Sequence, residues 1–553
     1  MKQMEYVVTA QEMKAYDKRT IEYHKLDGLV LMERAALGMA EEIKRRKKQP
    51  CSVLVLAGIG NNGGDGLAAG RMLMLDGYDV TFYLAGVGGT DDAAAVEEKC
   101  SISCKRQLEI LRSYGVTVKT DSTAAGIFRT KEYDIIIDAL FGVGLSRALT
   151  GEYAKLAEQV NQTDAFVAAC DIPSGICADT GQVLGCAVKA DLTVTFAWKK
   201  RGLLLYPGAE YAGEVCCVQM GITEHAFRET AADGKAFKEK KPEAFTYGNE
   251  DLCLLPKRSA DGNKGTFGKV LLIAGSVNMA GAACLAAKSC YRSGAGLVRV
   301  FTQEENRVIL QTVVPEAVLH TDRSLLKEDI EWADCIVAGP GIGMSERAAD
   351  VLQELLSTET KEAKICLLDA DALNLLAKEE GLMQTFAKQA AKWQMILTPH
   401  IAELSRLTGV ETKKLKEDII KCGREFTDAY PVTLVCKDAR TVVIHSAAEA
   451  VETEKVKEPH IYINTSGNDA LATAGAGDVL AGIIAGLAAQ GTDSFSAAAL
   501  GVYIHGLAGE RAAEGSSRYS VMAGDLPEAL GKVLGGIVRG KESETVRNTG
   551  DGK

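Results

Sequence analysis

The chain has 553 residues, of which 47% are hydrophobic and 25% are charged, and its formal net charge is −11. This length predicts two or more domains with cores of their own, and the composition is typical of a soluble globular protein. The negative charge argues against general nucleic-acid binding, which requires basic surfaces. No apolar stretch reaches the ~20 residues of a membrane helix, and the charged amino-terminal stretch lacks a signal-peptide core, so we predict a cytoplasmic protein without a membrane partner.

Fifteen cysteines are scattered through apolar segments and form no CxxC pair. A disulfide framework or a structural zinc site would require conserved-looking pairs or histidines at ligand spacing, and neither is present. We therefore expect buried, reduced thiols and no structural metal.

The first half of the chain alternates short β-branched runs with helical segments. Strands separated by helices predict a parallel sheet covered by helices on both faces. The last strand candidate is followed by a basic run, Trp198–Arg201, which is typical of a solvated face or else guides an anionic ligand. The strand candidates are Ser52–Ala57, Asp79–Leu84, Tyr133–Ala139, Ala165–Asp171 and Leu192–Ala197.

A glycine-rich loop follows the first of these strands. Gly58–Gly66 reads GIGNNGGDG and leads into an apolar-faced helix over Leu67–Leu75. Glycines at the carboxyl edge of a parallel sheet let backbone N–H groups approach a phosphate closely, and open α/β sheets bind ligands at this edge. The loop therefore predicts a ligand site, with a tight turn that binds nothing as the alternative.

Two further strand ends carry polar residues. Asp138 is followed by FGVGLSR over Phe141–Arg147, and Asp171 opens the run DIPSG. Because parallel strands end at the same edge, we expect these segments to meet the glycine loop. Asn62, Asp138 and Ser174 then offer hard oxygen ligands for an alkali or alkaline-earth cation, and the spacing leaves the ion open. Asp171 is a candidate general acid or base, or else a helix N-cap or turn residue.

The alternation is interrupted near residues 224–248, which are charged and poor in branched apolar residues. We therefore predict a first domain over 1–225, a linker over 226–244 and a second domain over 245–538. The polar remainder, 539–553, is predicted to be a flexible tail.

The second half repeats the pattern of strands and helices, so it also predicts an α/β domain. An alanine-rich helix is expected over Ala280–Ser293, closed by Gly294. The strand candidates are Lys269–Ala274, Leu297–Phe301, Asp334–Ala338, Ile365–Asp369, Met395–Thr398, Val432–Cys436 and Thr441–Ile444.

A second glycine-rich loop, Ala474–Asp478 (AGAGD), precedes an apolar helix over Val479–Leu487. Amide groups at a helix N-terminus can hold a phosphate. An aspartate that faces the acceptor can take a proton from an attacking hydroxyl, as phosphoryl transfer requires. Asp478 is therefore a candidate base, although aspartate is also a common helix N-cap.

Four other strand ends bring polar motifs to the same edge of the second sheet. Lys437 and Arg440 place two cations near a candidate nucleotide site. His400 either contacts a ligand or caps the helix that follows it. The motifs are GPGIG at Gly339–Gly343, DADALN at Asp369–Asn374, TPHIAEL at Thr398–Leu404 and KDART at Lys437–Thr441.

The motifs GIGNNGGDG, DALFGVGLSR and DIPSG, in this order and spacing, resemble the YjeF N-terminal domain, the NAD(P)H-hydrate epimerase family. The resemblance implies a Rossmann-like three-layer domain that interconverts the R and S epimers at C6 of hydrated NADH or NADPH. It also implies K⁺ on Asn62, Asp138 and Ser174, and Asp171 as the catalytic residue. The implied substrate contacts are Asn61, Asn62, Gly63, Gly64, Asp65, Gly142, Val143, Gly144, Leu145, Ser146, Arg147, Ala148 and Asp171.

The second half resembles the YjeF C-terminal domain through LPKRSADGNKGTFGKVLLIAGS, GAACLAAKSCYRSGAGLV, GPGIG, LLDADALN, LTPHIAEL and ATAGAGDVLAGIIAG. That domain is ribokinase-like and is an NAD(P)H-hydrate dehydratase, dependent on ADP or, in eukaryotes, on ATP. The resemblance implies Mg²⁺ with ADP, and loss of water from the S hydrate through phosphorylation of its C6 hydroxyl, with Asp478 catalytic. It implies substrate contacts at Ala282, Gly343, His400 and Asp478, and nucleotide contacts at Lys437, Asp438, Ala439, Arg440, Thr441 and Gly477.

We interpret the chain as an α/β bifunctional metabolite-repair enzyme, an isomerase joined to a lyase, that acts on small molecules and forms a homo-oligomer. One alternative is a ribokinase-like small-molecule kinase fused to a nucleotide-binding front domain, which yields a phosphorylated product and no NADH. Another is a non-catalytic scaffold that binds nucleotide without turnover.

Overall fold

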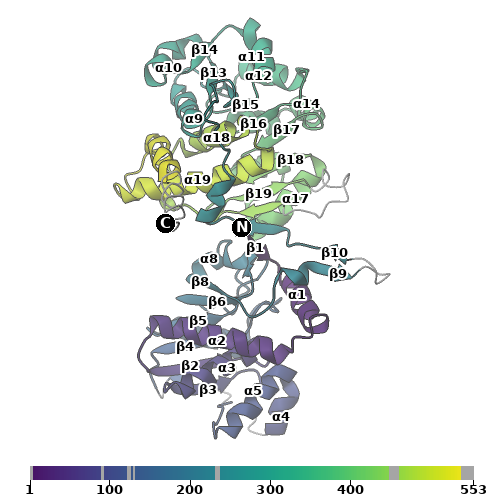
Figure 1. The fold of residues 1–553 in the computed structure, drawn as a ribbon, viewed down its shortest axis with the longest axis vertical. Coiled ribbons are helices and arrows are strands. Elements are labelled where there is room, and N and C mark those ends of the chain that lie inside the picture. Colours follow the sequence, from purple (N-terminus) through teal and green to yellow (C-terminus); the bar gives the residue numbers. More distant parts are fainter. Residues whose placement is uncertain are drawn as a thin grey trace, which may run out of the picture. The chain divides into compact units, whose positions relative to one another are not determined.

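The computed structural model describes residues 4–88, 93–120, 126–128, 131–230, 237–446 and 460–536. The chain forms two compact units (Figure 1). The amino-terminal unit consists mainly of Glu5–Phe245, and the carboxy-terminal unit begins at Thr246. The predicted tail over 539–553 lies outside the described residues.

The amino-terminal unit is built on a parallel sheet with the strand order β3-β2-β4-β5-β6-β8. The chain leaves β2 toward β3 and then returns to β4 on the other side, so the strand order switches at β2. Ligands of such sheets bind outside the carboxyl ends of the strands at the switch point. The strands are β2 (Ser52–Ala57), β3 (Asp79–Leu84), β4 (Ile135–Ala139), β5 (Phe166–Cys170), β6 (Leu192–Phe196) and β8 (Glu214–Val218).

Helices cover both faces of this sheet. Successive side chains of a strand point to opposite faces, so Val53 and Val55 pack in one core with α2, α3 and α5, whereas Leu54 and Leu56 pack in another with α7. This confirms the predicted three-layer α/β class. The helices are α1 (Ala10–Glu22), α2 (Gly28–Arg46), α3 (Asn61–Leu75), α4 (Ala93–Lys99), α5 (Ile102–Ser113), α7 (Gly151–Val160) and α8 (Gly208–Tyr211).

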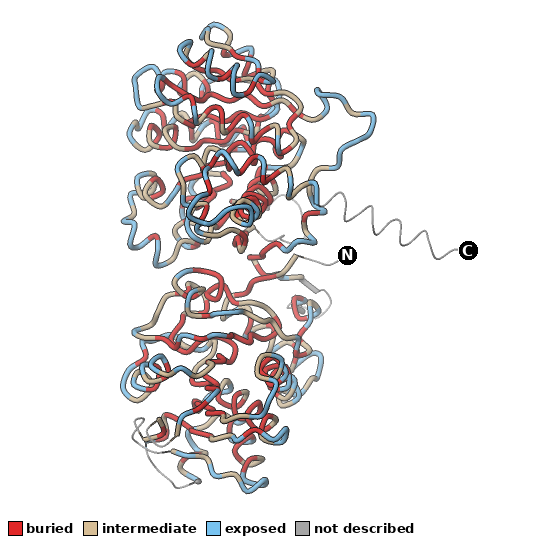
Figure 2. The backbone as a smooth tube through the Cα atoms, turned by 90° about the vertical axis from the view of Figure 1, so that its left-hand side faces the viewer, coloured by how far each residue is buried: buried red, intermediate tan, exposed pale blue. Residues whose placement is uncertain are grey.

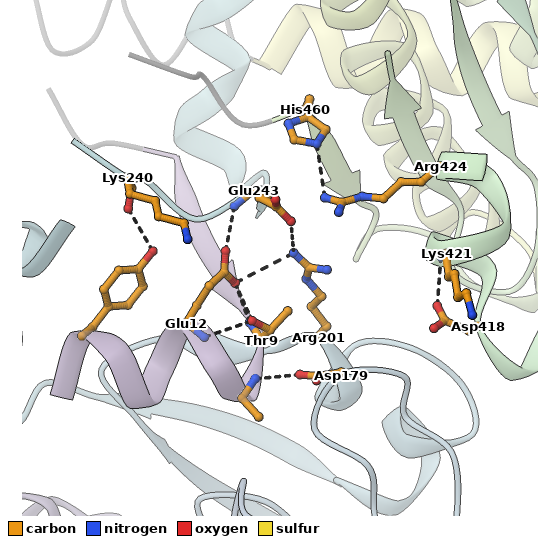
Figure 3. A network of polar contacts seen from close by, with 12 residues as sticks. Thr9, Glu12, Asp179, Arg201, Lys240, Glu243, Asp418, Lys421, Arg424 and His460 are labelled. Atoms are coloured by element: carbon orange, nitrogen blue, oxygen red, sulfur yellow. Dashed lines mark hydrogen bonds and ion pairs between the residues drawn. The ribbon is translucent and has the colours of Figure 1, made fainter. Parts of the chain in front are cut away.

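Part of the stretch predicted as a linker, 226–244, is folded onto the amino-terminal unit. Phe227 is buried in its core, where its ring lies 4.9 Å from that of Tyr16, and β9 (Arg228–Thr230) pairs with β10 (Phe237–Glu239). The Tyr16 hydroxyl donates to the Lys240 carbonyl at 3.1 Å, and the Glu243 amide donates to Glu12 Oε1 at 3.2 Å (Figure 3). The polar composition conceals this packing because most of the partners lie on α1, more than 200 residues away in sequence.

The carboxy-terminal unit has a sheet with the order β14-β13-β12-β15-β16-β17-β18-β19-β20. Neighbours from β14 to β18 pair in parallel, and β18, β19 and β20 pair antiparallel. The strands are β12 (Lys269–Ile273), β13 (Leu297–Phe301), β14 (Val318–His320), β15 (Cys335–Ala338), β16 (Ile365–Leu368), β17 (Gln394–Leu397), β18 (Val432–Cys436), β19 (Val442–His445) and β20 (Ile461–Ile463).

Helices also flank both faces of the second sheet, which confirms the α/β class of this half. Leu271 and Ile273 share a core with α12 and α13, while α18 contacts β15 on the opposite face and packs on α9 (Figure 1). The buried stretches follow the strands and the inner faces of the helices (Figure 2). The helices are α9 (Ala280–Arg292), α10 (Arg307–Val313), α11 (Leu326–Trp332), α12 (Glu346–Ser357), α13 (Asp371–Lys378), α14 (Glu380–Ala390), α15 (Ile401–Thr408), α16 (Thr412–Glu417), α17 (Ile419–Ala429), α18 (Ala476–Ala488) and α19 (Ser494–Glu514).

All fifteen cysteines lie among the described residues, and each is a free thiol. No helix in the described part of the chain has the length and apolar character needed to span a bilayer.

Candidate active sites

The first glycine loop packs tightly at the carboxyl end of β2. A Cβ atom added to Gly58 would lie 2.0 Å from the carbonyl oxygen of Leu140, and one added to Gly63 would lie 1.8 Å from that of Gly58. Helix α3 begins inside this motif, at Asn61 with Gly60 as its N-cap, so the predicted start of the helix at Leu67 was six residues too late. The absence of side chains at these glycines therefore lets the loop backbone lie directly against the end of β4, as a loop at the switch point requires.

A cavity of about 500 Å³ opens beside this loop. It brings together most of the predicted contact residues. Gly63 and Gly64 are buried in the first turn of α3, and Ser146, Arg147 and Ala148 are exposed outside the cavity lining. The predicted residues that do line it are Asn61, Asn62, Asp65, Gly142, Val143, Gly144, Leu145 and Asp171.

The three predicted cation ligands lie close together. Asp138 is fully buried, and its carboxylate accepts from the Ser174 hydroxyl at 2.6 Å and from the Ser174 amide at 2.8 Å. No Lys or Arg side chain pairs with it in the part of the chain that the structure describes, and burial raises its pKa to about 6. A Cβ atom at Gly142 would approach the Asn62 amide oxygen to 2.8 Å, so Asn62 borders the same strand end.

This group of residues fits a small hard cation. The Asn62 side-chain nitrogen is buried and has no hydrogen-bond partner among the described residues. Rotating the side-chain amide by half a turn exchanges its nitrogen and oxygen, so that the oxygen faces the cation site. A buried carboxylate without a cationic side chain is costly unless another positive charge compensates it. With only one carboxylate, the donor set suits a monovalent ion better than Ca²⁺, which takes 6–8 oxygen ligands and usually more than one carboxylate.

Asp171 lies in a tight turn after β5, with φ of +67°. Its Oδ1 accepts from Lys200, from the Thr195 hydroxyl at 3.1 Å and from the Phe196 amide at 3.3 Å. Lys200 is fully buried and also donates to Thr195 Oγ1 at 2.9 Å and to the Phe196 carbonyl at 3.0 Å. The interpretation of 198–201 as a solvated face is therefore wrong for Lys200, which compensates the charge of Asp171.

In the carboxy-terminal unit, the second glycine loop begins α18. Gly475, with φ of +92°, is the N-cap, so Asp478 is the third residue of the helix and the N-cap alternative is wrong. Burial raises the pKa of Asp478 to about 7, with further contributions from the charges of Asp369 and Asp371, whereas Lys437 lowers it.

Asp369 and Lys437 form a buried ion pair beside this loop. Lys437 Nζ donates to Asp369 Oδ1 at 2.8 Å, and the Thr398 hydroxyl donates to the same oxygen at 2.8 Å. A Cβ atom at Gly477 would lie 3.5 Å from Lys437 Nζ. The ends of β16, β17 and β18 thus meet the N-terminus of α18, and Lys437 holds a positive charge at the amide groups of the loop.

The remaining predicted substrate contacts border the same edge of the sheet. The Gly343 amide donates to Asp371 Oδ2 at 2.8 Å, and a Cβ atom at Gly341 would lie 3.0 Å from that of Ala282. His400 caps α15: its Nδ1 accepts from the amides of residues 402 and 403, and its side chain is half exposed. Burial and the charges of Lys437 and Arg406 lower the pKa of His400, which favours the neutral ring that a cap needs.

The predicted nucleotide contacts after Lys437 form the turn between β18 and β19. Arg440 donates to the Thr465 carbonyl at 2.9 Å, and the Asn464 amide donates to the Thr441 carbonyl at 2.9 Å. Asp438 and Ala439 are exposed at the tip of the turn. This turn is therefore tied to the segment that leads to α18.

Four residues at these sites were absent from the predicted contacts. Asp369 and Asp371 belong to a motif that was noticed, and their position directly after β16 was the signal that marked them. Lys200 and Thr195 gave no such signal, because a lysine in a basic run and a threonine in a strand are both ordinary. The structure joins them to Asp171 across 24 to 29 residues.

Comparisons with known proteins match both halves of the chain. Residues 28–202 match the family model described as YjeF-related protein N-terminus, and residues 270–532 match the model described as NAD(P)H-hydrate dehydratase. A bifunctional NAD(P)H-hydrate repair enzyme of Coxiella burnetii is 35% identical over 83% of this chain and 85% of its own length. One from Moorella thermoacetica is 32% identical over 99% of this chain and its full length (100%).

Among solved structures, the ADP/ATP-dependent NAD(P)H-hydrate dehydratase from Bacillus subtilis, co-crystallised with ATP and Mg²⁺, is similar to part of the chain. It is 29% identical, covers 52% of this chain and 96% of its own, and has a TM-score of 0.44.

Two α/β units, each with carboxylates at the carboxyl ends of its strands, and two family matches define a two-domain enzyme with a YjeF-related domain followed by a dehydratase domain. The chain belongs to the family of bifunctional NAD(P)H-hydrate repair enzymes. Both predicted resemblances and the enzyme class are thereby confirmed, and family membership favours repair over the kinase and scaffold alternatives.

Proposed function

We propose that the domain over 1–225 interconverts the R and S epimers at C6 of hydrated NADH and NADPH, and that the domain over 245–538 uses ADP or ATP to return the S epimer to NAD(P)H. The observation that carries the second step is Asp478, a carboxyl group with a pKa of about 7 beside a helix N-terminus and Lys437. Such a group can exchange a proton near neutral pH, as acid–base catalysis requires.

In the epimerase domain, Asp171 is the proposed catalytic group, and Lys200 holds its charge in place. The residues proposed to hold K⁺ are Asn62, Asp138 and Ser174, and the ion supplies positive charge beside an anionic substrate when bound. The residues proposed to bind the hydrated cofactor are those of the predicted set that line the cavity, Asn61, Asn62, Asp65 and Gly142–Leu145.

In the dehydratase domain, the amides at the N-terminus of α18, together with Lys437 and Arg440, are proposed to hold nucleotide phosphates. Asp478 takes the proton of the C6 hydroxyl as its oxygen accepts the terminal phosphoryl group of the nucleotide, which leaves as AMP from ADP or as ADP from ATP. Phosphate then departs with the electrons of the C6–O bond while C5 gives up a proton, and the electrons of that C5–H bond form the ring double bond. No group of three His, Cys, Asp or Glu side chains suited to a metal is found within the described ranges, so we propose that Mg²⁺ arrives with the phosphates of the nucleotide. A cytoplasmic location and a homo-oligomer stay predictions.

The function is tested by adding the purified chain, ADP and Mg²⁺ to a mixture of R and S hydrates of NADH and following the absorbance of reduced nicotinamide. Complete recovery of NADH supports both activities. Recovery of the S fraction alone, with no conversion of R beyond the spontaneous rate, contradicts the epimerase assignment. A stable phosphorylated product without recovery of NADH supports the kinase alternative.

The cation site gives a prediction of its own. We expect K⁺ to raise the midpoint of thermal unfolding of the amino-terminal unit, because an ion that binds only the folded state stabilises it by about 2.7 kcal/mol at 100 times its dissociation constant. Asp138→Asn removes the buried charge and should abolish this K⁺-dependent shift. Scanning calorimetry in matched KCl and tetramethylammonium chloride measures this shift in the unfolding midpoint. An equal shift in the wild type and in Asp138→Asn would contradict the assignment.

A further inference from the structure

Asp65 and Asp171 are two carboxyl groups that line one cavity in opposite environments. The carboxyl group of Asp171 accepts hydrogen bonds from a buried lysine, a hydroxyl and a backbone amide. Asp65 lies in the first turns of α3 and is partly buried. Its carboxyl group makes no hydrogen bond or ion pair with any residue that the structure describes.

The charges around Asp65 favour its neutral form. Burial raises its pKa well above the usual value, and the negative charges of Asp171 and Asp17 raise it further. Lys200 acts in the opposite direction, but its three donors are already used by Asp171, Thr195 and the Phe196 carbonyl.

Two thiols also interact with Asp65. Cys104 lies on α5, where a hydrogen bond with Cys100 and burial raise its pKa, and Cys170 ends β5, where burial raises its pKa. The raised pKa of each thiol means that neither adds a charge near Asp65. Lys14 of α1 also lines this cavity, and Lys200 is the cation that lowers the pKa of Asp65.

On the basis of the epimerase function proposed above, we propose that Asp65 is a catalytic acid, paired with Asp171 as the base, while Lys200 is the residue that positions the Asp171 carboxyl group. Pairs of carboxyl groups whose surroundings favour different protonation states mark the acid and the base of a reaction. The sequence interpretation gave Asp65 only a binding contact.

The pair accounts for inversion at C6. The hydrated ring carries a hydroxyl on C6, which is bonded to N1. Asp171 takes the hydroxyl proton, the C6–O bond becomes a carbonyl, and the electrons of the C6–N1 bond pass to N1, which takes the proton of Asp65. Rotation about C5–C6 presents the other face of the carbonyl, and the reverse steps form the C6–N1 bond again with both protons returned. Atoms and electrons balance without an oxidant or a reductant.

The test measures exchange between R and S hydrates by chromatography, with no nucleotide present, in the full chain. Asp65→Asn keeps the size of the side chain but supplies no carboxyl proton, so we expect the enzymatic exchange rate to fall about 10²–10⁴-fold. Asp65→Glu keeps the acid and should recover part of the rate. Removing a carboxyl group that resists ionisation should not lower the thermal stability of the unit, which calorimetry checks.

The pH profile separates an acid from a residue that only supports the cavity. Exchange should fall at high pH as Asp65 ionises. Asp65→Asn should lose the high-pH decline. The matched variant Asp17→Asn removes a negative charge that raises the pKa of Asp65. The pKa of Asp65 should therefore fall in this variant, and the high-pH decline of exchange should move to lower pH.

The outcomes distinguish the two proposals. A wild-type chain that does not exchange epimers above the spontaneous rate overturns the epimerase function and this inference with it. A wild-type chain that exchanges them, together with an Asp65→Asn variant that keeps the rate or the high-pH decline, overturns only the role of Asp65.

Discussion

Dehydration of the S hydrate is expected to fall about 10²–10⁴-fold in Asp478→Asn, while epimer exchange stays at the wild-type rate. The carboxyl group of Asp478 is the proposed acceptor of the C6 hydroxyl proton, and an amide cannot replace it. Because burial disfavours the charge of Asp478, the variant should be at least as stable as the wild type near neutral pH. Recovery of NADH from purified S hydrate with ADP measures the loss.

The rate of this reaction should rise with pH if Asp478 acts as a base. A base acts when ionised, so kcat/KM should rise with pH through a midpoint near 7, the value set by burial and by the neighbouring carboxylates. Lys437 lowers the pKa of Asp478, so Lys437→Met should shift the midpoint to higher pH. A profile that is flat from pH 5 to 9, or an Asp478→Asn variant with ordinary turnover, would show that Asp478 is not the base.

Lys200→Met is expected to destabilise the amino-terminal unit by about 3–5 kcal/mol, which is the range found when one partner of a buried ion pair is removed. Methionine fills most of the space of lysine but leaves the Asp171 carboxylate without its cation. Hydrogen exchange of peptides from β5 and β6 reports the free energy of unfolding of this unit without interference from the other.

A double-mutant cycle provides the control for this prediction. Asp171→Asn removes the carboxylate that Lys200→Met would leave unpaired. In the Asp171→Asn background, Lys200→Met should therefore lower the free energy of unfolding much less than it does in the wild type. Equal costs in the two backgrounds would mean that Lys200 contributes packing and not charge compensation.

The strands were largely predictable, and the exceptions have physical reasons. β2 and β3 have the predicted bounds because their β-branched runs are ended sharply by glycine and polar residues. The strands β8, β9, β10, β14 and β20 were not predicted. β8 lies at the edge of its sheet with Glu214 exposed, and each of the other four has only three residues, so none shows the long apolar run of a central strand.

Candidate site residues could be predicted where a motif follows a strand, since topology brings the carboxyl ends of parallel strands together. Asp138 and Asp171 were predicted in this way, and Asp478 was predicted from its glycine-rich loop. The pairing of Asp171 with Lys200 could not be predicted, because a lysine in a basic run is usually exposed and only the fold shows that Lys200 is buried. The contrast between Asp65 and Asp171 likewise depends on which neighbours each carboxyl group meets.

The positive φ of Asp171 has a genetic consequence. Asparagine is one of the few residues that take the left-handed backbone region at little cost, and it preserves the shape of the side chain. An aspartate codon becomes an asparagine codon through a single base change. Under the proposed function, one point mutation would thus silence the epimerase without a change of backbone conformation at this turn, although it would leave the buried charge of Lys200 unpaired. A cell that carried it would still clear the S hydrate, while the R hydrate would be converted only at the spontaneous rate.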